Sequence, residues 1–404
     1  MALVTYILGD CPGCGKQGFG NVDVYSTYVL RGCGGCKYKE SVQLPPIRKK
    51  IMYLDQFFLS HVFRGSDARF VEAARRIEKL AGLQLLLVPY SSVHEDETHQ
   101  WEQHAELFKF IKATSRGHQF APAYDVEKVQ LEKAFDAWLA GSPAEFVYDD
   151  RDVFHDNIHV WEGYFRIDVG RYTGDRDLIR SLKEQSIQAL VATFDGWRQS
   201  KQTFEQDLLD EYAAAAQNYV QSFGELVRRF RQGDFDLLNA PIISMMMWHL
   251  SNHIPETTPK DRHLQIVAEF LSSDHFRKTP YHDLSARIYA SLKAMVKEGA
   301  YTNPEKAVQR LAGFFYDVKH IATYAPYCDA FVVDQPMAGL VTRPTVAIHE
   351  RYGVNIFSLN NWDEMMTWLD RLEQGMSDDL KQALVDAYPW LRNRRDETGC
   401  YHGS

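Results

Sequence analysis

Ile51-Met-Tyr-Leu-Asp55 is a short apolar run that ends in a carboxylate, and the fold predicted for this chain follows from it. Apolar residues recur at helical spacing over residues 57–80, and Gly82 follows as a stop signal. Leu83-Gln-Leu-Leu-Leu-Val88 is a second apolar run, which Pro89 ends. Strand, helix and strand in this order predict two parallel strands joined by a right-handed crossover.

The same pattern returns nearer the C-terminus. A helix that starts at Asn303-Pro304 is predicted to precede the apolar run Ala330-Phe-Val-Val-Asp334, and residues 354–359 are predicted as a last strand. The pattern between the two regions is mostly helical, with candidate helices at 125–139, 176–198, 203–231, 241–252 and 261–271. We therefore predict an α/β fold with a parallel sheet that is interrupted by a large all-helical insertion.

Four of the six cysteines form two pairs, Cys11-x2-Cys14 and Cys33-x2-Cys36. This spacing is typical of a structural zinc site with four thiolate ligands, and the segment between the pairs is predicted as a β-hairpin. A redox pair or two disulfides are the alternatives, and a reducing compartment disfavours the disulfides. Because all four positions are Cys, the predicted site is closed and structural. We expect Cys328 to be a small buried residue and Cys400 a tail residue.

The chain of 404 residues is long enough for several structural units. The predicted division is 1–44 as a zinc ribbon, 45–115 as the first part of the sheet core, 116–299 as the helical insertion, 300–375 as the second part of the core, and 376–404 as a C-terminal helix and tail. Net charge is −9, but residues 1–50 carry +4 and the remainder −13, so the N-terminal segment is the expected contact for a phosphate backbone. Without a long apolar stretch or a basic leader, we expect a cytoplasmic protein with no membrane contact.

Acidic residues follow the predicted strands at the places where each strand ends. They are Asp55, the cluster Glu95-Asp96-Glu97, and Asp334, while Asp317 lies in the helix that precedes the last of these strands. In open parallel sheets ligands bind beyond the carboxyl ends of the strands. Carboxylates at such a place are suitable ligands for Mg²⁺ or Mn²⁺, which support phosphodiester hydrolysis.

With these residues in order, the sequence resembles a PIN-like nuclease over roughly residues 47–110 and 300–375. Ile51-Met-Tyr-Leu-Asp55 resembles the first strand of that family with its acid, and Pro89-Tyr-Ser-Ser-Val-His-Glu-Asp-Glu97 resembles the second strand and the start of an acid-bearing helix. Asp317 and Asp334 resemble the third and fourth acids. The resemblance implies that Asp55, Glu97, Asp317 and Asp334 are catalytic and hold Mg²⁺ or Mn²⁺.

Two departures from that family leave alternatives open. The insertion breaks its usual compactness, and Glu95 or Asp96 could replace Glu97 as the ligand; Asp329, at the start of the last catalytic strand, is a further candidate. The function expected from the resemblance is a metal-dependent endonuclease that cleaves RNA. A nuclease for single-stranded DNA, and a non-catalytic zinc-ribbon scaffold or nucleic-acid-binding protein, are the alternatives.

Other signals are weaker. The histidines of His94-Glu-Asp-Glu-Thr-His99 are five apart, whereas a zinc protease needs the four that place two ligands on one helix face. His249 and His253 have that helical spacing but lack a third ligand, so we expect an ordinary pair. No Gly-rich phosphate loop is present, so no nucleotide cofactor is expected. A protein partner could bind through the helical insertion.

Overall fold

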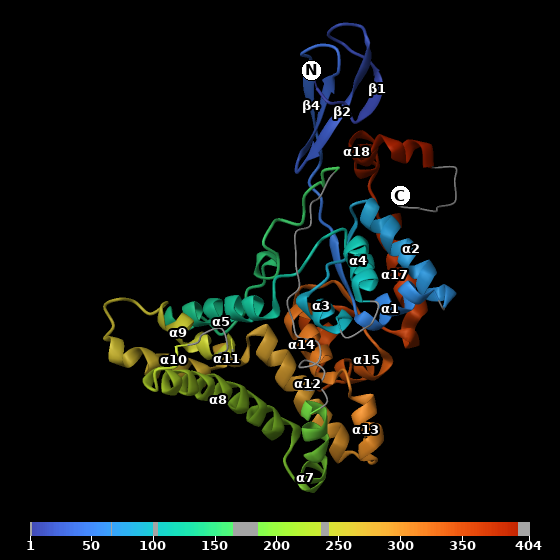
Figure 1. Ribbon diagram of the computed structural model, residues 1–404. Helices are drawn as coiled ribbons and strands as arrows, with labels where there is room; N and C mark the ends of the chain where they lie inside the picture. The colour runs from blue at the N-terminus through green and yellow to red at the C-terminus, as the bar shows by residue number, and fades with distance from the viewer. Residues whose placement is uncertain (1, 66, 100–103, 165–184, 236–241, 395–404) are drawn as a thin grey trace.

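The structure is a computed structural model that describes residues 2–65, 67–99, 104–164, 185–235 and 242–394 (Figure 1). Its described part contains two sheets of four strands each, one antiparallel and one parallel, and many helices. The antiparallel sheet is N-terminal and carries the cysteine pairs. The mixed α/β architecture with a parallel sheet, predicted from the apolar runs, is confirmed.

The parallel sheet contains the strands that the sequence predicted around its acids. They are β5 (Lys50–Leu54), β6 (Leu86–Leu87), β7 (Ala330–Val332) and β8 (Asn355–Phe357). Their order is β6-β5-β7-β8, and all pair in parallel, with Leu54 beside Val332. The chain winds to one side of β5 to reach β6 and to the other side to reach β7. The carboxyl ends of β5 and β7 therefore flank the topological switch point of the sheet.

Helices cover both faces of this sheet because alternate strand residues point in opposite directions. Met52 and Leu54 belong to one apolar cluster, and Ile51 and Tyr53 to the other. The first cluster includes residues of α1 (Gln56–Arg64), α2 (Ala68–Gly82), α4 (His104–Thr114) and α17 (Trp362–Gln374). The second includes residues of α12 (Pro280–Lys297), α13 (Pro304–Arg310), α14 (Phe314–Tyr324), α15 (Gln335–Val341) and α16 (Ile348–Tyr352). The result is a three-layer α/β/α core.

The single helix predicted over 57–80 is wrong in its extent. Gly65 closes α1 with a left-handed φ of 62°, and its N–H donates to the carbonyls of His61 and Val62. Asp67 then opens α2 by accepting a hydrogen bond from the N–H of Arg69. Glycine reaches positive φ at little cost and Asp is a favoured N-cap, so the two local signals outweigh the continuous apolar pattern.

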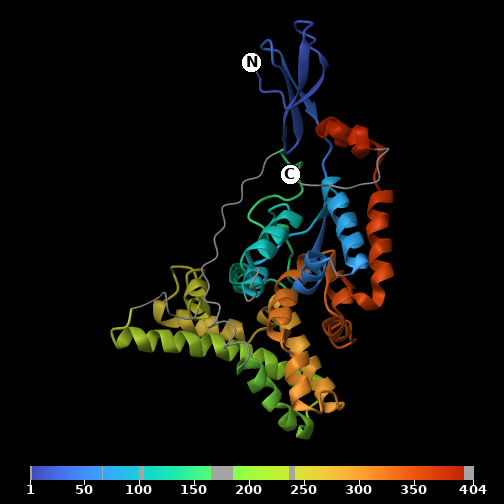
Figure 2. The same ribbon diagram turned by 45° about the vertical axis from the view of Figure 1, so that its right-hand side comes forward.

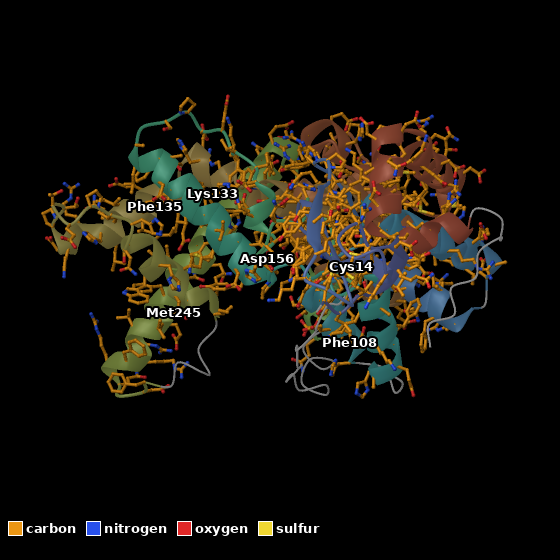
Figure 3. All side chains as sticks on the ribbon, turned by 90° about the horizontal axis from the view of Figure 1, so that it is seen from above. Cys14, Phe108, Lys133, Phe135, Asp156 and Met245 are labelled. Atoms are coloured by element: carbon orange, nitrogen blue, oxygen red, sulfur yellow. The ribbon has the colours of Figure 1, made fainter. Side chains whose placement is uncertain are left out.

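The helical insertion has an apolar core of its own at one end. It contains buried residues of α5 (Ala123–Leu139), α8 (Phe204–Arg231), α9 (Met246–Ser251), α10 (His263–Leu271) and α11 (Asp274–Arg277). Figure 3 shows this arm, with Phe135 and Met245, extending to one side of the core. The predicted helix over 176–198 lies partly outside the described residues; residues 185–192 are helical and α7 (Phe194–Gln199) follows.

The helix α12 connects arm and core, and its buried Leu284, Ile288, Leu292 and Val296 belong to the core cluster. Its Lys297 pairs with Asp207 of α8 at 2.5 Å, and its Lys293 pairs with Glu211 at 2.5 Å. Short 3₁₀ turns complete this part of the chain and its surroundings: η1 (Asp150–Asp152), η2 (Ile242–Met245), η3 (Lys260–Arg262), η4 (Ala325–Tyr327) and η5 (Leu359–Asn361).

The N-terminal ribbon packs against the C-terminal elements. Its strands are β1 (Tyr6–Asp10), β2 (Gln17–Tyr25), β3 (Tyr28–Cys33) and β4 (Lys39–Gln43), and its partners are α18 (Asp378–Ala387) and η6 (Pro389–Arg394) (Figure 2). Buried Asn21 donates to the carbonyl of Asp386 at 2.7 Å, and Arg31 forms an ion pair with the Asp386 carboxylate at 2.8 Å. These contacts fix the ribbon beside the amino ends of the parallel strands. Among the described residues, no helix combines the length and apolarity needed to cross a membrane.

The central strand pair should carry a large share of the stability. Phe331 of β7 is fully buried and its ring stacks on Tyr53 of β5 at 4.4 Å. We expect Phe331→Ala to lower the free energy of unfolding by ~3–5 kcal/mol, because it removes buried apolar surface and leaves a cavity. Denaturant unfolding measures this change. Phe235, which is 71% exposed, is the matched control, and Phe235→Ala should change stability by under ~0.5 kcal/mol; equal effects would contradict the assignment of the core.

Candidate metal centre and acidic site

The four cysteines predicted as zinc ligands lie together at one end of the ribbon. Their sulfur atoms all lie within 4.8 Å of one another, with Cys11 Sγ 3.6 Å from Cys36 Sγ and Cys14 Sγ 3.8 Å from Cys33 Sγ. Four sulfurs bound tetrahedrally at ~2.3 Å from a zinc ion lie ~3.8 Å apart. The cluster could therefore hold one zinc ion without rearrangement of the strands.

Backbone amides support the charge that metal-binding thiolates carry. The N–H of Gly13 points at Cys11 Sγ at 3.3 Å, and that of Gly35 at Cys33 Sγ at 3.2 Å. The Gly35 hydrogen bond is the largest of the effects that lower the pKa of Cys33 to about 7. The predicted hairpin between the two pairs is β2 and β3, so each strand delivers its cysteines to the same end of the sheet.

Asp55 follows β5 at the switch point and is only 8% exposed. Its N–H donates to the carbonyl of Val332 at 3.0 Å, so the end of β5 is locked to the end of β7. Its Oδ1 accepts a hydrogen bond of 2.7 Å from the N–H of Gln56, as the N-cap of α1. The carboxylate is thus held by both the sheet and the helix that follows it.

Glu97 belongs to α3 (Ser92–Thr98), which two contacts attach to the same edge of the sheet. The N–H of Ser91 donates to Nδ1 of buried His94 at 3.1 Å, so the proton of the neutral ring lies on Nε2, which donates to the carbonyl of Leu54 at 2.8 Å. Burial lowers the pKa of His94 to about 4, so the ring stays neutral at pH 7. Farther along, Gln56 donates to Thr98 Oγ1 at 3.2 Å.

Asp334 follows β7 and caps α15 by accepting a hydrogen bond of 2.9 Å from the N–H of Met337. Its carboxyl group is half-buried, and burial raises its pKa. Asp55 shows the stronger effect. Burial raises the pKa of Asp55 well above its usual range, and the negative charges of Glu97 and Asp334 raise it further. These three acids are therefore electrostatic neighbours.

Asp317 lies in the first turn of α14. Its neighbour Tyr316 has a pKa raised to about 12 by burial and then by the charges of Asp96 and Glu97, which places this turn beside α3. A helix that leads into a parallel strand runs antiparallel to it, so its first turn lies at the carboxyl edge of the sheet. All four predicted acids thus belong to one edge.

The acids share an edge but do not form a compact group. In the described ranges, only the four cysteines form a group of three or more ligating side chains whose ligand atoms all lie within 4.8 Å of one another. The acids form no such group there. The convergence of these acids on a shared metal ion therefore stays a prediction. Whether Glu95, Asp96 or Glu97 binds metal stays a prediction.

Asp329 lies at the opposite end of the sheet, before β7. Its Oδ1 pairs with Lys50 Nζ at 2.6 Å and its Oδ2 accepts from the N–H of Ile51 at 2.9 Å. It therefore ties the start of β7 to the start of β5 and is separated by the length of the strand from Asp334. The candidate role of Asp329 in the acidic site is wrong for this geometric reason.

His253, one of the two histidines at helical spacing, contacts two carboxylates of the arm. His253 Nδ1 lies 2.9 Å from Asp136 and its Nε2 lies 3.5 Å from Glu132, as a partly exposed contact between α5 and the loop after α9. The sequence analysis missed the role of His94. Its hydrogen bond to the carbonyl of Leu54 positions the helix that carries Glu97. A lone histidine three residues before Glu97 gives no local signal of that contact.

Comparisons with known protein families, with curated proteins and with solved structures return no match to this chain. The geometry above is therefore the basis for any functional assignment.

We expect about one zinc ion per chain in protein purified without chelator, and its loss in Cys14→Ala. Removing one of four thiolates opens the coordination shell, and a ribbon this small depends on its metal to fold. Elemental analysis measures the zinc, and amide hydrogen exchange should show local unfolding of residues 2–44. Cys328→Ala is the control, because buried Cys328 lies outside the cluster and its loss should leave zinc content unchanged. Full zinc occupancy in Cys14→Ala would contradict the site.

Asp55 should make metal-free stability depend on pH. Its folded pKa is raised above the unfolded value of ~3.9, so between the two values the folded state binds more protons than the unfolded state. Stability should therefore fall as pH rises from ~4 towards the folded pKa, and Asp55→Asn should lose the part of this dependence that Asp55 contributes. Urea unfolding at several pH values, with Mg²⁺ and Mn²⁺ left out and no chelator added, measures it. An unchanged slope in Asp55→Asn would show that Asp55 ionises normally.

Proposed function

We propose that this protein is a metal-dependent endonuclease that hydrolyses phosphodiester bonds, with RNA as its substrate. One observation carries the proposal. The buried carboxylate of Asp55 lies at the switch point of a parallel sheet, where the charges of Glu97 and Asp334 raise its pKa further. Burying a carboxylate among other carboxylates is costly. Such strain is typical of functional sites, where a cation relieves it.

The donor set fits a hard divalent cation. Carboxylate oxygens are the ligands that Mg²⁺ and Mn²⁺ prefer, and Asp55, Glu97 and Asp334 would hold the ion, with Asp317 contributing from the first turn of α14. When bound, such an ion lowers the pKa of a coordinated water and neutralises charge on the phosphate. The chain itself supplies the rigid ends of β5 and β7, the attachment of α3 through His94, and a half-buried edge.

The resemblance to PIN-like nucleases supports the same assignment. The acids occur in the chain order that this family uses, and Asp317 lies in the first turn of the helix that leads to the strand before Asp334. RNA is preferred over single-stranded DNA because that family mostly cleaves RNA. We propose that the N-terminal segment of residues 1–50, which carries a net charge of +4, contacts the substrate away from the acids.

A non-catalytic zinc-ribbon scaffold is the second candidate, and one observation favours it. Asp55 and Asp334 both act as N-caps, of α1 and α15, and N-capping alone is a sufficient structural reason for an Asp at each place. The two candidates differ in what an amide at these positions does. Asn caps a helix as well as Asp but is a poor ligand for Mg²⁺ or Mn²⁺.

We therefore expect Asp55→Asn and Asp334→Asn to keep their fold and to lose at least ~100-fold in cleavage of a panel of RNA and single-stranded DNA with Mn²⁺. Asp329→Asn is the matched control, since Asp329 lies at the other end of the sheet, and it should cleave like the wild type. Gel assays of purified protein, with circular dichroism as the test of folding, measure both. Cleavage that is equal in wild type and Asp55→Asn would make the scaffold the better candidate.

A further inference from the structure

A cavity of about 220 Å³ lies between the end of α2, the loop that carries Gly163 and Tyr164, and the C-terminal turn η6. Its walls include the aromatic side chains of Tyr164, Tyr388 and Trp390, with Arg116 and the backbone of Gly82 and Gly163. Gly82 ends α2, a helix antiparallel to the strands, so the cavity belongs to the amino edge of the parallel sheet. Neither the zinc cluster nor the acidic site uses these residues.

The aromatic walls are held rigidly. Tyr164 donates from its hydroxyl to the carbonyl of Ala387 at 2.9 Å, and Tyr388 donates to the carbonyl of Glu162 at 2.8 Å. The ring of Trp390 lies 5.3 Å from that of Tyr164 and 5.5 Å from that of Tyr388. Rings that are ordered before binding lose little conformational entropy when a ligand arrives.

Part of the Trp390 side chain is exposed to solvent. It is 36% exposed, and its ring contacts among the described residues are tilted by 51° to 58°, so none of these rings stacks on the indole in parallel. An indole face at the wall of a cavity is a suitable surface for another planar ring. Each nucleobase has such a face, and stacking on aromatic side chains is the general means of holding single-stranded nucleic acid.

The charge beside the cavity suits an anion. Arg116 lies at its wall with a side chain 42% exposed, and its Nη2 is 3.0 Å from Glu162 Oε2. Buried Lys49 pairs with the same carboxylate at 2.8 Å, and His118 contacts it at 3.0 Å. Arg116 is thus the charged side chain at the cavity wall, and a phosphate group there would share its guanidinium with Glu162.

The size of the cavity limits the ligand. Its volume of about 220 Å³ is smaller than the ~300–1,000 Å³ typical of pockets for whole drug-sized molecules. This size favours a single planar ring system over a complete nucleotide as the group that enters the cavity. The sugar and phosphate of a bound nucleotide would therefore remain outside, on the side of Arg116.

We propose that this cavity is a base-binding subsite for single-stranded nucleic acid, in which one base stacks on Trp390 and its phosphate pairs with Arg116. The proposal rests on the proposed function, because it makes the ligand part of the nuclease substrate. The acids lie at the carboxyl edge of the sheet and the subsite at the amino edge. A substrate that occupies both must run along the core past the sheet, so short oligonucleotides would bind here without reaching the acids.

The test measures binding of a fluorescein-labelled hexa-adenylate by anisotropy in the Asp55→Asn background, without chelator so that ribbon zinc is kept. We expect Trp390→Ala to weaken binding about 10-fold or more, Trp390→Phe to weaken it less, and adenosine monophosphate to compete better than inorganic phosphate. Arg116→Asn should weaken binding and flatten its salt dependence. Asn is chosen because Arg116 has a left-handed φ of 52°, which Asn tolerates. Trp248→Ala, in the arm and 49% exposed, is the control and should bind like the parent.

A second measurement does not depend on the folding of a variant. A hexanucleotide with 4-thiouridine, photo-crosslinked to the otherwise unchanged protein, should attach to the peptide that contains Tyr388 and Trp390. Crosslinks elsewhere, equal affinity in Trp390→Ala, or binding of a proline-rich peptide in place of nucleotide would overturn the proposal. If the subsite binds but the wild type cleaves nothing, the proposed function fails and the subsite stands. If the wild type cleaves and Trp390→Ala binds the oligonucleotide as well as the parent, the proposed function stands and the subsite fails.

Discussion

The parallel pairing of β5 with β7 is the interaction on which the rest of the structure depends. These strands lie next to each other, with Leu54 beside Val332, although more than 270 residues of chain separate them. The pair forms the centre of the sheet, supplies buried side chains to both apolar layers, and brings Asp55 and Asp334 to the switch point. The entropy of closing such a long loop grows only slowly with its length, so a large insertion is thermodynamically tolerable. The insertion also folds around its own apolar cluster, which reduces the cost further.

Much of this arrangement could be predicted from local sequence. The runs that end in Asp55 and Asp334 are short, apolar and bounded by stop signals, and a strand buried on both faces has that pattern. The cysteine spacing predicted the cluster at the end of the ribbon, since ligand geometry allows few alternatives. The helix boundaries near Gly65 were wrong because single capping residues decide them, and a continuous apolar pattern conceals such residues.

What could not be predicted are the contacts between segments far apart in the chain. His94 attaches the acid-bearing helix to Leu54 by a bond of 2.8 Å, and Asn21 attaches the ribbon to residues near 386. A single polar residue has many possible partners, and its sequence neighbours carry no information about which one it meets. Asp329 illustrates the same limit: in sequence it is a further candidate for the acidic site, yet the direction of β7 places it at the other end of the sheet, beside Lys50.

The separation of β5 from β7 also has a consequence for synthesis of the protein. At ~5–20 residues per second, β7 leaves the ribosome on the order of ten to sixty seconds after β5. During that interval β5 lacks its partner strand on the side that β7 later occupies, and its apolar side chains lack the helices α12 and α14 that later cover one face. Exposed strand edges are sites of wrong pairing. The nascent chain therefore passes through a vulnerable stage whose duration is set by the length of the insertion, so a shorter insertion would reduce its dependence on chaperones.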